Sequence, residues 1–286
     1  MLSARTRLAA VIGHPVRHSL SPTIFNAAFE AAGLDWAYAA FEVAEGNAPT
    51  AVAGARALGI DGLSVTMPHK AAVIPALEEL TPDAEALGAV NCIARVGDRL
   101  VGHNTDGPGL VDALAVDEGL DLSGRRVVVV GAGGAARAVI RSIARAGAAS
   151  VVVVNRSPEP AERAAALGGA VARVGRPEDV AEADVVVNAT PLGMGAVTAL
   201  DGQPEPLPLD PERLGAGQVV VDLIYHPPVT PLLAAARAKG LVAVNGLGML
   251  VHQAAHAYRI WTQEEPPLAA MSAAVVAALE ERTRSD

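Results

Sequence analysis

The segment Gly124-Arg-Arg-Val-Val-Val-Val-Gly-Ala-Gly-Gly-Ala-Ala-Arg137 decides the fold of this chain. Its four consecutive valines, Val127 to Val130, predict a strand that is buried on both faces, as in a parallel sheet. A glycine-rich turn follows at once, and an Ala/Ile-rich helical pattern then covers residues 135–146. A second apolar strand is predicted at residues 149–154. Strand, glycine turn, helix and strand in this order are typical of a dinucleotide-binding βαβ unit.

The glycines of this turn have separate physical roles. Gly131 permits the tight turn, and Gly133 lets a pyrophosphate approach the backbone. The helix that follows offers unpaired N–H groups and the positive end of its dipole to the phosphates. A plain turn without a ligand is the alternative, and the complete βαβ context disfavours it. The expected cofactor contacts in this turn are Gly131, Ala132, Gly133, Gly134 and Ala135.

Length and composition indicate two globular domains and exclude several functions. The chain has 286 residues, which is enough for two hydrophobic cores. Hydrophobic residues make up 51% of it, but aromatic residues only 3%. The formal net charge is −9. Few aromatic side chains and a negative charge disfavour binding to nucleic acid and to anionic membranes.

The cysteine content and the lengths of the apolar runs indicate the cellular compartment of the protein. Cys92 is the single cysteine, so no internal disulfide can form, as is usual in a reducing cytosol. The apolar run at residues 6–13 is too short for a signal peptide and meets His14-Pro15. No run of 18 apolar residues occurs. We therefore expect a soluble cytoplasmic protein.

The first 106 residues predict alternating strands and helices, hence an α/β domain. The predicted strands cover residues 8–12, 36–43, 60–65, 90–93 and 99–102, and the predicted helices cover residues 23–32, 48–58 and 71–80. A glycine-rich segment at 107–109 marks a domain boundary. We expect a substrate-binding domain at residues 1–108, completed by C-terminal helices at 248–286, and a Rossmann-type nucleotide domain with a parallel sheet at residues 109–247. The active site is expected in the cleft between the two domains.

Two serines precede the first predicted helix. Ser21 is predicted at its N-cap, with Pro22 at the first helical position. Ser19 and Ser21 either cap this helix or bind a small carboxylate at its N-terminus, and both roles are compatible.

Lysine is rare in this chain, where only Lys70 and Lys239 occur. Arginine stays protonated at neutral pH, whereas lysine can exchange a proton. Lys70 is predicted in the first turn of the helix 71–80, where the helix dipole would lower its pKa. This position and the polar neighbour Thr66 favour a functional role over that of a solvated surface lysine.

Nine motifs, in order along the whole chain, resemble the shikimate dehydrogenase family. They are His18-Ser-Leu-Ser-Pro22, Val65-Thr-Met-Pro-His-Lys70, Gly88-Ala-Val-Asn91, Gly102-His-Asn-Thr-Asp106, Gly131-Ala-Gly-Gly-Ala-Ala-Arg137, Asn155-Arg-Ser157, Asn188-Ala-Thr-Pro-Leu-Gly-Met194, Asp222-Leu-Ile-Tyr225 and Gly248-Met-Leu-Val-His-Gln253.

The resemblance implies a reaction and a set of site residues. The implied reaction is the NADP-dependent interconversion of 3-dehydroshikimate and shikimate. Ser19 and Ser21 would hold the substrate carboxylate, with Tyr225 nearby. The residues implied to face the ring hydroxyls are Thr66, Lys70, Asn91, Asp106 and Gln253, with Lys70 and Asp106 as the catalytic pair. Thr190 and Met194 would lie near the nicotinamide, and Gly246 is a further expected cofactor contact.

These residue types suit the implied chemistry. Reduction of a ring ketone needs a hydride, which NADPH brings, and a proton for the developing alkoxide. Lys70 could donate this proton or stabilise the alkoxide electrostatically, and Asp106 could orient the ammonium group. This chemistry requires no metal. The seven histidines also show no spacing typical of metal ligands.

The cofactor type is indicated after the second strand of the nucleotide domain. A carboxylate there would bind the ribose 2′-hydroxyl of NAD, whereas an arginine accommodates the 2′-phosphate of NADP. This chain has Asn155-Arg156-Ser157, which predicts NADP(H) with Arg156 on the phosphate. Pro160 stands where the family often has a second basic residue, and Arg163 is a possible substitute.

Several alternatives stay open at this level. Quinate or an aminated shikimate analogue could be the substrate, since relatives that use quinate differ at few residues. A regulatory NADP-binding protein without turnover is a second alternative, which the presence of both Lys70 and Asp106 disfavours. The chain could be a monomer or a homodimer.

Overall fold

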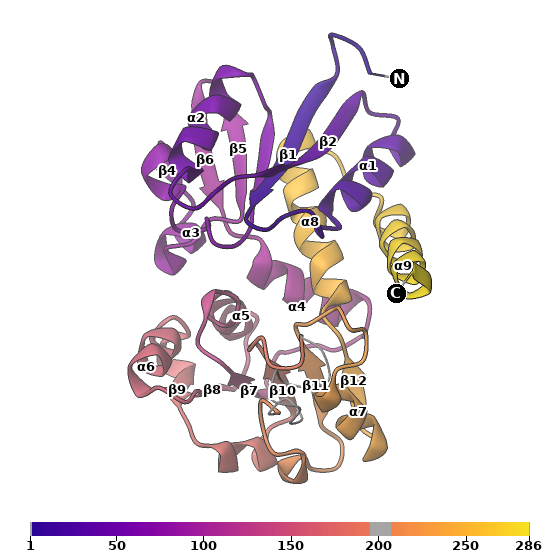
Figure 1. Cartoon of the computed structure of the whole chain (residues 1–286). Helices are drawn as coiled ribbons and strands as arrows, with labels where there is room; N and C mark the ends of the chain where they lie inside the picture. The colour runs from indigo at the N-terminus through magenta and orange to yellow at the C-terminus, as the bar shows by residue number, and fades with distance from the viewer. Residues whose placement is uncertain (1, 195–206, 286) are drawn as a thin grey trace. The chain divides into compact units, whose positions relative to one another are not determined.

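In the computed structural model, residues 2–194 and 207–285 are described, and they form two compact units. Unit 1 comprises Met1–Thr105 and Val251–Asp286, and unit 2 comprises Asp106–Leu250. The chain passes from one unit to the other between residues 105 and 106 and again between 250 and 251. Each unit is built on one sheet, so the prediction of an α/β fold in two parts is confirmed (Figure 1).

Unit 1 contains a mixed six-stranded sheet in the order β2-β1-β3-β5-β6-β4. Its strands are β1 (Arg7–Gly13), β2 (Trp36–Glu42), β3 (Gly62–Val65), β4 (Glu79–Leu80), β5 (Cys92–Val96) and β6 (Arg99–His103). Strand β1 pairs in parallel with β2 and β3, whereas β5 runs antiparallel to both β3 and β6. The short strand β4 is parallel to β6.

Helices cover both faces of this sheet. The helices of unit 1 are α1 (Ser21–Ala31), α2 (Ala48–Ala57), α3 (Pro82–Leu87), α9 (Leu268–Ser285) and the part of α8 (Leu247–Thr262) from Val251 onward. On one face, Val52 of α2 packs with Ile12 and Leu63 of the sheet. On the other face, Trp261 of α8 lies over Gly62 and donates its indole N–H to the carbonyl of Ile93 at 3.0 Å.

An aromatic cluster fills this second face. It consists of Phe25, Phe29, Trp36, Tyr38, Tyr258 and Trp261. The rings of Phe25 and Tyr38 are stacked, with centroids 4.4 Å apart. Six of the eight aromatic residues of the chain are thus gathered in one cluster. The few aromatic residues of the chain are therefore concentrated in unit 1, where their large apolar side chains stabilise its core.

The prediction of a helix over 71–80 is wrong. This segment forms turns, a short 3₁₀ helix at Ile74–Ala76 and then strand β4. Pro75 lacks a backbone N–H and disfavours helical geometry at the residue before it, which explains why no α-helix continues here. Lys70 therefore lies in a turn and not in the first turn of a helix, so the helix-dipole argument does not apply to it.

The predicted cap by Ser21 is also wrong. Helix α1 begins at Ser21 itself, its N-cap is Leu20, and no side chain caps it. The Ser19 hydroxyl instead accepts the backbone N–H of Ser21 at 3.2 Å. Ser21 itself is buried within this first turn.

Unit 2 contains a parallel six-stranded sheet in the order β12-β11-β10-β7-β8-β9. Its strands are β7 (Arg126–Val130), β8 (Ser150–Val154), β9 (Ala172–Val174), β10 (Val185–Asn188), β11 (Val219–Asp222) and β12 (Val242–Val244). Its α-helices are α4 (Asp106–Val116), α5 (Gly134–Arg145), α6 (Pro158–Ala166) and α7 (Pro231–Ala238), together with the first turn of α8. Short 3₁₀ helices lie at Gly169–Val171, Pro177–Glu182 and Pro211–Arg213.

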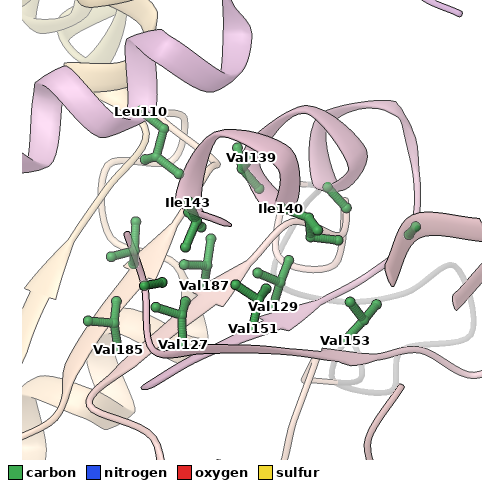
Figure 2. Packing of buried hydrophobic residues seen from close by; sticks show 14 of the residues in the cluster. Leu110, Val127, Val129, Val139, Ile140, Ile143, Val151, Val153, Val185 and Val187 are labelled. Carbon is green, nitrogen blue, oxygen red and sulfur yellow. The ribbon is translucent and has the colours of Figure 1, made fainter. Parts of the chain in front are cut away.

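The valine-rich strands are buried on both faces, as predicted. Val127 and Val129 pack with Ile140 and Ile143 of α5 (Figure 2). Their neighbour Val128 faces the opposite side and packs in a second cluster with Leu232 and Leu233 of α7. Burial on both faces is the reason for the unbroken valine run, because each strand residue meets one of two hydrophobic layers.

Two glycines of unit 1 provide a matched test of packing. A Cβ built on Gly62 would lie 2.5 Å from the Trp261 ring, whereas one on Gly54 of α2 would meet nothing within 4 Å. We expect Gly62→Ala to lower the free energy of unfolding by about 1–3 kcal/mol through overpacking. Gly54→Ala should instead raise it by about 0.5–1 kcal/mol, since alanine favours a helix. Urea unfolding monitored by tryptophan fluorescence measures both, and equal effects would contradict the packing of Trp261 over Gly62.

Candidate functional site

The candidate residues of unit 1 that precede or follow strands belong to one edge of its sheet. Strand directions place the carboxyl ends of β1, β3 and β6 and the amino end of β5 on this edge. Ser19 and Ser21 follow β1, Thr66 and Lys70 follow β3, and Asn91 directly precedes β5. Gln253 lies half-buried on α8 in the same unit. Segments far apart in the sequence thus supply polar side chains to one edge.

Backbone hydrogen bonds fix the turn that carries Lys70. The N–H of Thr66 donates to the carbonyl of Ile12 at 3.0 Å, and the N–H of Val90 donates to the carbonyl of Lys70 at 2.8 Å. The buried ring of His69 makes a 2.7 Å hydrogen bond between its Nε2 and the carbonyl of Val43. Lys70 is half-buried, and its backbone is adjacent to the segment that leads into Asn91.

Asn91 holds the end of unit 1 in place. Its side chain is buried, and its Oδ1 accepts the backbone N–H of Thr105 at 2.8 Å. Its Nδ2 donates to the Thr105 hydroxyl at 2.9 Å. Asp106 follows Thr105 directly, is 8% exposed and begins helix α4 of unit 2. The amide of Asn91 therefore fixes the residue next to the predicted catalytic carboxylate.

Two polar residues of this region that form a hydrogen bond with each other are not singled out by the sequence. The Tyr38 hydroxyl donates to the Ser64 hydroxyl at 2.7 Å, joining β2 to β3 across β1. Ser64 is a polar residue in an otherwise apolar strand, which is the one signal in the sequence that could draw attention to it. Nothing in the local sequence predicts that a tyrosine 26 residues earlier is its partner.

The candidate cofactor residues of unit 2 lie at the carboxyl edge of its parallel sheet. The turn 131–135 follows β7, residues 155–157 follow β8, Thr190 and Met194 follow β10, and Gly246 follows β12. The chain order reverses between β7 and β10, which is the point where open α/β sheets bind ligands. Tyr225 also belongs to this unit and follows β11 at the same edge.

The glycine turn has the shape of a phosphate cradle. Gly131 has a φ of 113°, and a Cβ on it would lie 3.1 Å from the carbonyl oxygen of Ala189 after β10. Gly133 and Gly134 are exposed, and a Cβ on either would project into open space. Helix α5 begins at Gly134 without a side-chain cap, so its first N–H groups face that space. This arrangement fits the pyrophosphate of a dinucleotide.

The segment after β8 presents one exposed arginine. Asn155 is half-buried and donates through Nδ2 to the carbonyl of Ser157 at 2.9 Å, which fixes the turn around Arg156. The side chain of Arg163, the possible substitute for a second basic residue, forms an ion pair with Glu159 one turn earlier in α6. The phosphate-binding charge of this turn is therefore expected from Arg156.

A buried polar network lies beside these loops. Asn188 and Asp222 are opposite each other at the ends of β10 and β11, and Asn188 Nδ2 donates to Asp222 Oδ1 at 3.0 Å. Asp222 also accepts the Thr230 hydroxyl at 2.7 Å and the Ile224 N–H at 3.2 Å. The Thr190 hydroxyl donates to Asn188 Oδ1 at 2.7 Å. The loops that carry Thr190 and Tyr225 are thus linked through two adjacent strand ends.

Burial is the main influence on the pKa of Asp222, the titratable group of this network. Desolvation raises the pKa of Asp222, and the hydrogen bonds from Thr230, Ile224 and Asn188 oppose that rise.

Among the described residues, no group of three or more His, Cys, Asp or Glu side chains could hold a metal ion. Within the same part of the chain, no helix has the length and apolar character needed to cross a membrane.

Three family models match the chain in succession. Residues 11–93 match the shikimate dehydrogenase substrate-binding domain, residues 113–201 match shikimate/quinate 5-dehydrogenase, and residues 246–276 match the C-terminal domain of shikimate 5′-dehydrogenase. Together these matches cover parts of both units.

Relatives of known name match nearly the full length. A protein of Geobacter metallireducens named shikimate dehydrogenase (NADP(+)) is 46% identical over 97% of this chain and 99% of its own length. A crystal structure of a shikimate dehydrogenase in complex with NADP+ superposes with a TM-score of 0.89, at 38% identity, covering 97% of each chain. The Thermus thermophilus shikimate 5-dehydrogenase, solved with NADP(H) and shikimate, has a TM-score of 0.87 and 38% identity, covering 95% of this chain and 99% of that one. The chain belongs to the shikimate dehydrogenase family.

Proposed function

We propose that this chain is a shikimate dehydrogenase that reversibly reduces 3-dehydroshikimate to shikimate with NADPH. The observation that carries the proposal is the half-buried Lys70, held by the backbone beside Asn91 at a polar edge of unit 1. Unit 2 supplies the other requirement, a parallel sheet with a glycine turn suited to a dinucleotide. Relatives that match nearly the full length carry this name.

The substrate is assigned to polar side chains of several elements. Shikimate carries one carboxylate and three hydroxyls, so its site needs both anion-binding and hydroxyl-binding groups. We assign the carboxylate to Ser19 and Ser21, with Tyr225 nearby, and the ring hydroxyls to Thr66, Asn91 and Gln253. A site that pairs each hydroxyl discriminates strongly against analogues that lack one, because its own polar groups would then be left unpaired.

Lys70 and Asp106 are assigned the proton chemistry. NADPH, when bound, supplies the hydride. The ammonium group of Lys70 donates a hydrogen bond to the carbonyl oxygen and a proton to the developing alkoxide. Asp106 accepts hydrogen bonds at the same centre and orients the ammonium group. In the reverse direction Lys70 accepts the proton of the shikimate hydroxyl.

NADP(H) is assigned to the carboxyl edge of the unit 2 sheet. The pyrophosphate fits the open space at Gly133 and Gly134, at the N-terminus of α5. Arg156, with Asn155 and Ser157 around it, would bind the 2′-phosphate. Thr190 and Met194 would flank the nicotinamide, and Gly246 belongs to the same edge.

The biological setting follows from this reaction. Shikimate is an intermediate of chorismate and aromatic amino acid biosynthesis, so we propose that the enzyme acts in this pathway, in the cytoplasm, as a monomer or a homodimer. Its partners are then small molecules, without nucleic acid or membrane.

A second candidate is dehydrogenation of quinate, since the family model matching residues 113–201 describes shikimate/quinate 5-dehydrogenase. Steady-state kinetics on shikimate and quinate, each with NADP+ and NAD+, distinguish the two. We expect the highest kcat/KM for shikimate with NADP+. A higher kcat/KM for quinate would replace the first assignment with the second.

Removal of the Lys70 ammonium group tests the catalytic assignment. We expect Lys70→Ala to lower kcat by about 10²- to 10⁴-fold with a smaller change in KM for shikimate, as for loss of a positioned proton donor. Lys239, the only other lysine, pairs with Glu212 at 3.3 Å, and Lys239→Ala should leave kcat unchanged. A pH–rate profile of wild type and Lys70→Ala measures whether the lysine titrates in catalysis. Near-normal turnover of Lys70→Ala would remove it from the mechanism.

Charge reversal at Arg156 tests the cofactor assignment. Arg156→Asp should raise KM for NADP+ by about 10-fold or more, because a carboxylate repels the 2′-phosphate and favours the 2′-hydroxyl of NAD+. Its KM for NAD+ should change much less. Arg163→Ala is the matched control, since Arg163 pairs with Glu159, and it should affect neither KM strongly. If both cofactors responded equally to Arg156→Asp, another residue would hold the 2′-phosphate.

A further inference from the structure

Tyr38 combines a buried ring with a polar contact at the edge of the unit 1 sheet. Its side chain is 5% exposed and stacks on Phe25. Phenylalanine would serve this packing as well, as Phe25 and Phe29 do in the same cluster. A buried hydroxyl costs desolvation free energy that only a hydrogen bond offsets. Packing alone therefore does not explain why this position has a tyrosine and not a phenylalanine.

The hydroxyl of Tyr38 acts as the donor in its bond to Ser64. Tyr38 Oη lies 2.7 Å from Ser64 Oγ. A phenol is a stronger acid than an aliphatic alcohol and is the better donor of the two. Burial raises the pKa of Tyr38 far above its usual value, so the donated proton is retained at every working pH. Since Ser64 Oγ accepts this proton, the proton of Ser64 itself points to a different acceptor.

Ser64 lies where a substrate acceptor is expected. It is half-buried and stands near the carboxyl end of β3. Thr66 is two residues further on, and side chains two apart along an extended chain point to the same side. The Ser21 hydroxyl also approaches Tyr38 closely enough to lower its pKa, partly opposing the effect of burial. Tyr38 thus contacts hydroxyls from β3 and α1, both at the edge that carries the proposed substrate residues.

We propose that Tyr38 is a positioning residue that holds Ser64 as a hydrogen-bond donor to an oxygen atom of shikimate. This inference rests on the proposed function and adds two residues to the substrate site. Tyr38 does not touch the substrate in this scheme. Its hydroxyl occupies one lone pair of Ser64 Oγ with a hydrogen bond and thereby fixes the direction in which the Ser64 hydroxyl donates. Its effect on binding is transmitted mainly through Ser64, with a further contribution through the Ser21 hydroxyl that it also contacts.

The test is a double-mutant cycle on substrate kinetics. Tyr38→Phe keeps the ring and removes only the hydroxyl, and it should raise KM for shikimate about 3- to 10-fold, as for one neutral hydrogen bond. Its kcat and its KM for NADP+ should stay within about twofold of wild type, since neither the hydride nor the proton step is changed. Ser64→Ala should raise KM for shikimate at least as much. The double variant should raise KM by clearly less than the product of the two single effects, because Tyr38 acts mainly through Ser64.

A matched control separates positioning from stability. Tyr258 is a second buried tyrosine of the aromatic cluster, and Tyr258→Phe should leave KM for shikimate unchanged. A Tyr38→Phe variant with lowered Tm and unchanged KM would show a structural role only and overturn the inference. Additive effects of Tyr38→Phe and Ser64→Ala would overturn it as well. Absence of shikimate oxidation by the wild type would instead refute the proposed function, so the two failures are distinguishable.

Discussion

The direction of the strands is the constraint on which the candidate site residues of each unit depend. In unit 2 all six strands are parallel, so every loop that follows a strand reaches the same edge of the sheet. In unit 1, β5 reverses direction, and its amino end joins the carboxyl ends of β1 and β3. This reversal brings Asn91 to the same edge as Lys70. A parallel β5 would have placed Asn91 at the opposite edge.

Hydrogen bonds between the strand ends then turn these edges into ordered surfaces. Asn91 fixes Thr105 through two bonds, and Asp222 joins the ends of β10 and β11 to Thr230 at the N-terminus of α7. Each of these polar groups is buried, and its hydrogen bonds offset the cost of removing it from water. Rigid strand ends position loop residues better than the loops could alone.

Much of the fold is predictable because it depends on short-range patterns. The valine run 127–130 and the glycine turn after it predict β7 and the start of α5 correctly, since burial on both faces leaves a continuous apolar signature. The helix expected at 71–80 does not form because Pro75 outweighs the apolar spacing around it. The contacts of Tyr38 with Ser64 and of Asn188 with Asp222 join residues 26 and 34 positions apart, which no local pattern encodes. The roles of the individual site residues come from family resemblance, and they stay predictions.

The aromatic cluster also makes the two units spectroscopically unequal. Both tryptophans of the chain, Trp36 and Trp261, lie in unit 1, whereas unit 2 has Tyr225 as its sole aromatic side chain. Trp36 packs against Phe29 and lies under the guanidinium of Arg7, 4.2 Å from its ring centre, while Trp261 is buried over the sheet. Indole emission therefore reports the local environment of one unit, and circular dichroism of the backbone reports both. Comparing the two signals during denaturation would reveal whether the units lose their structure together or in sequence.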